Sequence, residues 1–149
     1  MYRLDLRGNV WPMENITAGG YKLAGNIQDK FEQHQTWGLH AVIDLYDCDG
    51  EKIKSFSEIE RFVAELCDLI DMKRYGKALI ERFAGGYYEG VSLLQFIETS
   101  SITAHFDERA NRAFIDIFSC KYFDPEVAVA FCRDFFKAQS QKYQVLLRN

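Results

Sequence analysis

The sequence predicts an α+β fold, in which a mainly antiparallel sheet carries two helices on one face. Short apolar runs typical of strands recur from residue 38 to the end of the chain. Only two segments combine helical spacing with a helix-start signal. The strands come in runs broken by these two helices, which is typical of an α+β layer and not of a parallel sheet.

The first strand is expected at residues 38–46 (GLHAVIDLY), which end at the turn residues Asp47-Cys48-Asp49-Gly50. Ser57 and Glu60 match a capping box, so a helix is expected over residues 57–72. Its apolar face would carry Ile59, Phe62, Val63, Leu66 and Ile70.

Four further strand candidates follow, and Gly85-Gly86 separates the first two. A second helix is expected to begin at Asp124-Pro125, with Asp as the N-cap and Pro in the first helical position. The predicted order is therefore β-α-β-β-β-β-α-β. The strands after the first helix are expected at 77–83, 91–97, 102–106, 112–118 and 142–147.

Length and composition indicate one globular domain of 149 residues, with 48% hydrophobic and 27% charged residues. Residues 1–36 are polar and contain several glycines, so we expect an N-terminal extension or arm, followed by a domain over residues 37–149. The high aromatic content, 15%, favours a well-packed core or a stacking pocket without choosing between them.

Charge and cysteine usage exclude several function classes. The net charge of −4 argues against nucleic acid as a partner. No apolar run could cross a membrane and no secretory signal is visible, so a cytoplasmic protein is expected. The cysteines form no Cys-x-x-Cys pair, so we expect no metal site. Three of them, Cys48, Cys67 and Cys132, are expected to be core or surface filler with reduced thiols.

The candidate catalytic residues lie in a stretch whose pattern otherwise predicts paired strands. Ser100, His105 and Cys120 supply a hydroxyl, an imidazole and a thiol, which could act as nucleophile, base and proton donor. His40 is expected to be a packed histidine. Asp44 and Asp116 interrupt apolar strands and are expected to face solvent or a second layer.

From about Trp37 onward the pattern resembles the small bacterial type of S-adenosylmethionine decarboxylase. The resemblance rests on motifs in order, and the spacings agree: Ser92 lies eight residues before Ser100, His105 five after it and Cys120 twenty after it. The motifs are Gly38-Leu39-His40, Asp44-Leu45-Tyr46-Asp47-Cys48-Asp49, Gly90-Val91-Ser92, the stretch from Ala113 to Cys120, and Asp124-Pro125-Glu126.

The resemblance implies a proenzyme that cleaves itself between Thr99 and Ser100. Ser100 would become a pyruvoyl group, the cofactor, which forms a Schiff base with the substrate amine. Ser92 and His105 would assist the cleavage, with His105 as the acid-base group, and Cys120 would be the proton donor to the product. Ser101, directly adjacent, is the rival cleavage residue, and on a strand its hydroxyl would point to the other face.

The chain departs from the family at the substrate pocket. The family has Glu before the cleaved serine, where this chain has Thr99, with Glu98 one residue further away. Arg109 stands at the position of the family's ribose-binding Glu, and an Arg cannot accept hydrogen bonds from hydroxyls. The family's adenine-stacking aromatic should fall near Gly86-Tyr87, where the resemblance ends, and Tyr87, Tyr88 or Phe83 could take its place. Glu98, Tyr87 and Arg109 are therefore the candidate substrate-binding residues.

The resemblance implies a homodimer acting on a small amino-acid-type substrate. The expected substrate is S-adenosylmethionine, decarboxylated for spermidine synthesis. Two alternatives stay open, a pyruvoyl-dependent decarboxylase of ornithine or arginine, and an unprocessed, catalytically silent member that binds a partner or metabolite.

Overall fold

A computed structural model describes residues 2–4, 10–12, 26–33 and 36–149 of the chain. The helices are α1 (Ile27–Gln33), α2 (Phe56–Leu69) and α3 (Pro125–Phe135), with a 3-10 turn η1 (Gly86–Tyr88). The strands are β1 (Tyr2–Leu4), β2 (Val10–Pro12), β3 (Gly38–Tyr46), β4 (Arg74–Phe83), β5 (Gly90–Ile97), β6 (Ser100–Asp107), β7 (Arg112–Ser119) and β8 (Ser140–Arg148).

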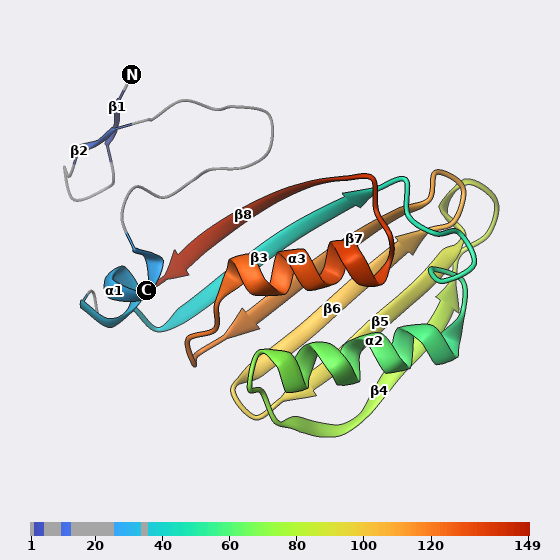
Figure 1. Cartoon of the computed structure of the whole chain (residues 1–149), viewed down its shortest axis with the longest axis horizontal. Coiled ribbons are helices and arrows are strands. Elements are labelled where there is room, and N and C mark those ends of the chain that lie inside the picture. Colours follow the sequence, from blue (N-terminus) through green and yellow to red (C-terminus); the bar gives the residue numbers. More distant parts are fainter. Residues whose placement is uncertain (1, 5–9, 13–25, 34–35) are drawn as a thin grey trace.

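Six of these strands form one antiparallel sheet in the order β4-β5-β6-β7-β3-β8, with α2 and α3 side by side on one face (Figure 1). The predicted α+β class and the order of elements from β3 to β8 are confirmed. β3 has the predicted bounds, whereas the other strands are one to three residues longer at one or both ends. β-pairing continues into polar residues that carry no apolar signal, which explains the longer strands.

The start of α2 differs from the sequence prediction. The N-cap is Ser55, whose hydroxyl accepts the amide of Glu58 at 3.3 Å. Ser55 has an extended backbone, as an N-cap requires, whereas Ser57 already lies inside the helix and its hydroxyl contacts that of Ser55 at 3.0 Å. The helix ends at Leu69, before the predicted residue 72, because Asp71 adopts a positive φ of 54°. At α3, the predicted cap is confirmed, since Asp124 accepts the amides of Glu126 and Val127.

The aromatic residues explain how the helices hold the sheet. The ring of Phe62 on α2 lies 4.6 Å from that of Phe136 and 6.0 Å from that of Phe131. Phe136 in turn meets Phe106 of β6 at 5.1 Å, which links the helix layer to the sheet. The sequence left two explanations for the high aromatic content, a packed core and a stacking pocket. These rings belong to the core.

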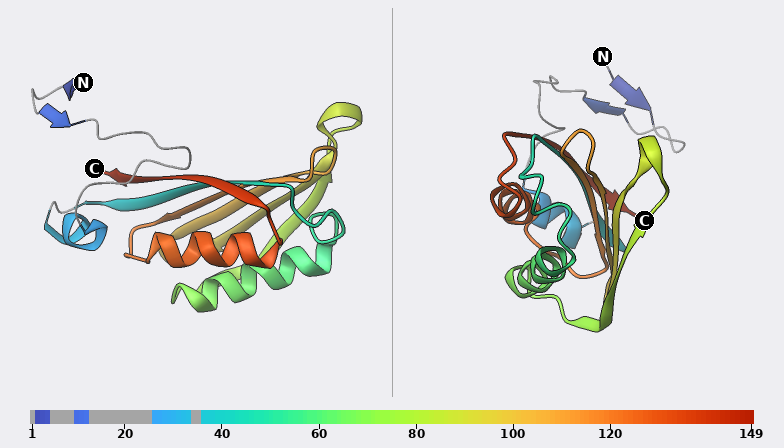
Figure 2. Two further views of the ribbon diagram at one scale, coloured as in Figure 1. Left: turned by 45° about the horizontal axis from the view of Figure 1, so that its top comes forward. Right: turned by 90° about the vertical axis from the view of Figure 1, so that its right-hand side faces the viewer.

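The opposite face of the sheet is not covered by any described helix (Figure 2). Strand alternation places Ile102 and Ala104 of β6 against the helices, fully buried, and Thr103 and His105 on the other side. We call this second side the open face. It includes His40, Val42, Asp44, Leu79, Ser92, Leu94, Phe96, Ser101, Thr103, His105, Phe114, Asp116, Phe118 and Leu146.

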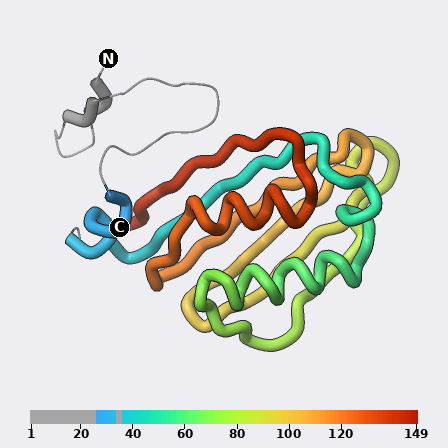
Figure 3. Tube along the Cα trace, viewed as in Figure 1, coloured from blue at the N-terminus to red at the C-terminus, as the bar shows by residue number. Residues whose placement is uncertain are grey.

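Residues before β3 include elements that the sequence did not predict. β1 and β2 pair with each other in a separate two-stranded sheet. α1 lies near the start of β3 and the end of β8 in the chain trace (Figure 3), and Phe31 of α1 meets the ring of Tyr122 at 5.8 Å. Part of the predicted arm therefore packs on the body, while much of it lies outside the described residues. No helix in the described part of the chain is long and apolar enough to cross a membrane.

Gly90 is the first residue of β5, and the position has no room for a side chain. A Cβ built at Gly90 would overlap the backbone carbonyl of Phe106 on the neighbouring strand. We expect Gly90→Ala to lower the free energy of unfolding by about 1–3 kcal/mol, because the backbone of β6 must shift to make room. Chemical denaturation measures this change.

Gly85→Ala is the matched control, because Gly85 has an extended φ of −153° and a Cβ there meets no atom within 4 Å. Its effect should stay within about 0.5 kcal/mol. Equal losses in the two variants would contradict the assignment of a close backbone contact at Gly90.

Candidate active site

The candidate cleavage site is the turn of the hairpin between β5 and β6. Ile97 pairs with Ser100, so Glu98 and Thr99 form a two-residue turn. The Ser100 hydroxyl lies against the carbonyl oxygen of Thr99, the residue before it. This contact brings a nucleophilic oxygen next to the peptide bond that the sequence predicts to be cleaved.

The end of β7 supplies the other groups at this bond. β6 and β7 pair Ser100 with Ser119, which places Cys120 beside the turn. The Cys120 amide donates to the Thr99 carbonyl at 3.1 Å, and the Cys120 sulfur lies 3.4 Å from the Ser100 hydroxyl oxygen. An amide aimed at a carbonyl stabilises negative charge that develops on its oxygen when the carbon is attacked. Cys120 thus contacts this site through its backbone and its thiol.

Ser92 and His105 form a second group on the open face. The Ser92 hydroxyl contacts Nδ1 of His105 at 2.9 Å, across the β5–β6 pairing. His105, however, lies five residues along β6 from Ser100. In an extended strand that separation is about 17 Å. The predicted set therefore splits into a cleavage group, Ser100 and Cys120, and a distant Ser92–His105 pair.

Ser101, the rival cleavage residue, has different surroundings. It lies on the open face between Phe96 of β5 and Phe118 of β7. Its side chain takes no part in the hydrogen bonds described at this turn, whereas Ser100 contacts both the preceding carbonyl and Cys120. The geometry favours Ser100.

The three candidate substrate-binding residues lie at opposite ends of the sheet. Glu98 is at the cleavage turn, and its carboxylate accepts from Lys73 at 2.7 Å, which raises the pKa of Lys73. Tyr87 and Arg109 lie at the other end, where the Arg109 guanidinium stacks 4.7 Å from the centre of the Tyr87 ring. Two of the three positions at which the sequence is expected to depart from the family pattern are thus in contact with each other.

The turn that carries Arg109 is held by a nearby ion pair. Burial alone would raise the pKa of Asp107, but hydrogen bonds from Arg112 and from the amides of Ala110 and Arg109 outweigh it and lower this pKa. Arg82 pairs with Glu108 in the same turn. Among the described residues, no carboxylate lies within ion-pair distance of the Arg109 guanidinium.

Sequence reasoning missed an aromatic pair next to the cleavage turn. Trp37 stacks on Phe118 at 5.9 Å and remains 63% exposed. Gly38 permits this arrangement, because a Cβ there would overlap the Phe118 ring. Only the sheet register, which sets Phe118 between Ser101 and His40, could have revealed the pair.

His40 is half-buried, as predicted, but it also has a polar partner on the open face. Its Nε2 lies 2.8 Å from an Asp116 carboxylate oxygen. Asp44, the other acidic residue within an apolar strand, lies on the same face. Both aspartates therefore point away from the helices, which agrees with the alternation read from the sequence.

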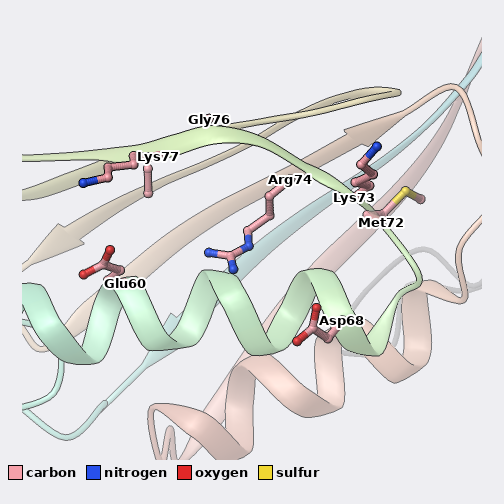
Figure 4. Close-up of a pocket in the computed structure, with 8 residues that line it drawn as sticks. Glu60, Asp68, Met72, Lys73, Arg74, Gly76 and Lys77 are labelled. Atoms are coloured by element: carbon pink, nitrogen blue, oxygen red, sulfur yellow. The ribbon is translucent and has the colours of Figure 1, made fainter.

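A pocket between α2 and β4 meets the cleavage turn through Lys73, which pairs with Glu98, and Met72, which contacts Thr99 (Figure 4). Its lining is mostly charged, and it contains none of the predicted catalytic side chains. The lining residues are Glu60, Asp68, Met72, Lys73, Arg74, Gly76, Lys77 and Ala78. Within the described part of the chain, no group of three or more His, Cys, Asp or Glu residues is arranged to hold a metal ion.

Comparison with known proteins gives consistent results. A sequence model of the S-adenosylmethionine decarboxylase family matches residues 39–149. The S-adenosylmethionine decarboxylase proenzyme of Geobacillus sp. (strain WCH70) is 27% identical over 107 residues, which cover 72% of this chain and 83% of the relative. The proenzyme of Clostridium botulinum (strain Hall) is 33% identical over 98 residues, which cover 65% of this chain and 81% of the relative.

One solved structure has the same fold. The adenosylmethionine decarboxylase from Aquifex aeolicus VF5 superposes with a TM-score of 0.65 at 21% sequence identity. The match covers 76% of this chain and 92% of that protein. At 21% sequence identity, this similarity shows a shared fold and nothing further.

The four cysteines should differ in their reactivity. Burial raises the pKa of Cys48 and Cys67 to about 11 and also raises the pKa of Cys132, so these thiols form little thiolate at neutral pH. Cys120 is exposed. We expect iodoacetamide to modify the native protein once, at Cys120, as seen by peptide mass spectrometry.

Cys120→Ala is the control for this experiment, and it should leave the native protein unmodified under the same conditions. In denaturant the original protein should take up four labels. Labelling of a buried cysteine at the rate of Cys120 in the native state would contradict the packing described above.

Proposed function

Because the chain belongs to the S-adenosylmethionine decarboxylase family, we propose that it is a self-processing, pyruvoyl-dependent decarboxylase of S-adenosylmethionine. Its product would be the aminopropyl donor for spermidine synthesis. The observation that carries the proposal is the cleavage turn, where the Ser100 hydroxyl lies against the Thr99 carbonyl and the Cys120 amide donates to the same oxygen.

The proposed self-cleavage uses the contacts at this turn. The Ser100 oxygen attacks the Thr99 carbonyl carbon, and the peptide C–N bond breaks as its nitrogen gains a proton, which leaves an ester. Loss of the Ser100 Cα proton then breaks the Cβ–O bond, releasing the Thr99 carboxylate and leaving dehydroalanine. Water adds and ammonia leaves, so that a pyruvoyl ketone begins the second chain.

The fit of a pyruvoyl group at this position rests on the residues around Ser100. A pyruvoyl ketone bonded to the substrate amine supplies an electron sink for decarboxylation. The Cys120 thiol, 3.4 Å from the Ser100 hydroxyl, is close enough to give a proton to the substrate carbon that loses carbon dioxide. The Cys120 amide keeps the neighbouring backbone in place.

His105 needs a second copy of the chain to reach the cleavage turn. Within one chain it lies about 17 Å along β6 from Ser100. A two-fold axis lying between two stacked open faces and running across the strands near Thr103 would exchange the two ends of β6. The end of β6 that carries the cleavage turn in one copy would then lie opposite the end that carries His105 in the other. We therefore propose a homodimer with two shared active sites.

The open face supports this assembly. It exposes large apolar side chains on the side of the sheet that α2 and α3 leave free, most of them on β4 and β5, and a group of exposed apolar side chains is typical of an interaction surface. Two sheets packed face to face, as in a sandwich, would bury these side chains. The exposed residues are Tyr75 (72%), Leu79 (53%), Phe83 (54%), Phe96 (56%) and Leu146 (42%).

Two aromatic surfaces could bind the adenine of the substrate. Trp37 and Phe118 form a stacked pair at the cleavage end of the sheet. In the proposed dimer, the Arg109–Tyr87 pair of the second copy would approach from the opposite side. The guanidinium can donate to ribose oxygens, although it cannot accept from them as a carboxylate does. The substrate class is therefore part of the proposal and is tested below.

The central prediction is that the purified protein consists of two fragments, residues 1–99 and 100–149. Mass spectrometry should find the second fragment without a free amino terminus, and the protein should release labelled carbon dioxide from S-adenosylmethionine. Ser100→Ala should abolish both the cleavage and the release of carbon dioxide, because it removes the attacking oxygen. Ser101→Ala is the matched control and should still be cleaved after Thr99.

Three other results would change the conclusion. An intact chain that stays uncleaved after prolonged incubation would favour the silent, metabolite-binding member of the family. Carbon dioxide from ornithine or arginine, with none from S-adenosylmethionine, would keep the cleavage chemistry and overturn the substrate. Cleavage after Ser100 would mean that Ser101, and not Ser100, is the attacking residue that becomes the pyruvoyl group.

The shared site predicts complementation between two inactive variants. Ser100→Ala and His105→Ala should each stay intact when expressed alone. In a mixed dimer, one site combines Ser100 of the His105→Ala chain with His105 of the Ser100→Ala chain. Co-expression with distinguishable tags should therefore cleave the His105→Ala chain only. Cleavage of His105→Ala alone at the original rate, or none in the mixture, would contradict the shared site.

A further inference from the structure

The turn at the cleavage site is not one that its own sequence favours. Two-residue hairpin turns that match strand twist require positive φ, and they favour Asn and Gly. Glu98 and Thr99 are neither, and neither has a positive φ. The turn geometry must therefore depend on contacts from outside the hairpin.

Three such contacts hold the turn. The Glu98 amide donates to the Lys73 carbonyl at 2.9 Å, and the Cys120 amide donates to the Thr99 carbonyl at 3.1 Å. The third contact is between side chains, because the Thr99 and Ser119 hydroxyl oxygens lie 2.9 Å apart. The backbone and the side chain of Thr99 are thus held by two consecutive residues at the end of β7.

Ser119 is a rigid partner for Thr99. Its side chain is fully buried, and its oxygen accepts the amide of Lys121 at 3.0 Å. The Met72 sulfur lies 3.3 Å from the Thr99 hydroxyl and 3.6 Å from that of Ser119, so whichever hydroxyl does not donate to the other can donate to sulfur. Each hydroxyl proton therefore has an acceptor within the cluster.

We propose that Thr99 and Ser119 form a positioning pair that orients the Thr99–Ser100 peptide for attack by the Ser100 hydroxyl. Holding the Thr99 side chain restricts rotation of the peptide plane that follows it. This keeps the Thr99 carbonyl oxygen on the Cys120 amide and its carbon toward Ser100. The inference rests on the proposed self-cleavage and assigns to these two residues a role in its first step.

The test follows the rate of cleavage in newly made full-length chains. The protein is synthesised in a cell-free translation system, and the conversion of the 17.3 kDa chain into fragments is timed by gel electrophoresis. Thr99→Val keeps the shape of the side chain and removes the hydroxyl. We expect Thr99→Val and Ser119→Ala to cleave about tenfold more slowly, as expected for the loss of one orienting hydrogen bond.

Three further variants separate positioning from general stability. Thr99→Ser keeps the hydroxyl and should cleave at close to the original rate. The double variant Thr99→Val/Ser119→Ala should be no slower than the slower single variant, because the two residues act through one contact. Thr36→Val makes the same exchange at a buried hydroxyl that has no hydrogen-bond partner among the described residues, and it should leave the rate unchanged.

The outcomes distinguish this inference from the proposed function. If the original chain does not cleave, both the proposed function and the positioning pair are overturned. If it cleaves and Thr99→Val cleaves equally fast, only the positioning pair is overturned. Additive losses in the double variant, or failure of Thr99→Ser to restore the rate, would also overturn it. A Ser119→Ala chain that does not fold, as judged by circular dichroism, leaves the decision to Thr99→Val and Thr99→Ser.

Discussion

The pairing register of β6 against β7 is the constraint on which the rest of the candidate site depends. It sets Ser100 opposite Ser119, and therefore Cys120 beside the turn that carries Thr99. A slip of one residue would move every side chain of β6 to the other face of the sheet. The register is fixed by burial, because Ile102 and Ala104 are fully buried against the helices. Core packing thus determines the contacts at the peptide bond.

The same alternation produces a molecule with two unlike faces. One face is closed by α2 and α3 through the rings of Phe62 and Phe136. The other keeps large apolar side chains exposed next to the polar pairs Ser92–His105 and His40–Asp116. A surface of this composition is typical of an interaction site. The proposed dimer would cover this face and, by the same operation, bring the distant histidine to the cleavage turn.

The end of the sheet that carries Arg109 holds two of the residues at which the sequence is expected to depart from the family pattern. Arg109 does not stand alone, because it stacks on Tyr87, which occupies the other altered region. The neighbouring cations Arg82 and Arg112 are matched by Glu108 and Asp107. The difference is therefore a pair of residues in mutual contact and not an isolated substitution. This pair is the part of the site on which the choice of substrate is proposed to depend.

The sequence by itself determined the fold class and the order of elements from β3 to β8. These features follow from local patterns: strand alternation, helical spacing and the Asp124-Pro125 cap, which need no knowledge of distant residues. The choice of Ser100, His105 and Cys120 came from a family resemblance, and their roles remain proposals. Only the tertiary structure decided that Ser55 caps α2, that Trp37 stacks on Phe118, and that Thr99 meets Ser119. The physical reason is that these depend on where the chain turns and on register between strands far apart in sequence. The same holds for the separation of His105 from Ser100, since five residues along a strand are near in sequence but about 17 Å apart in space.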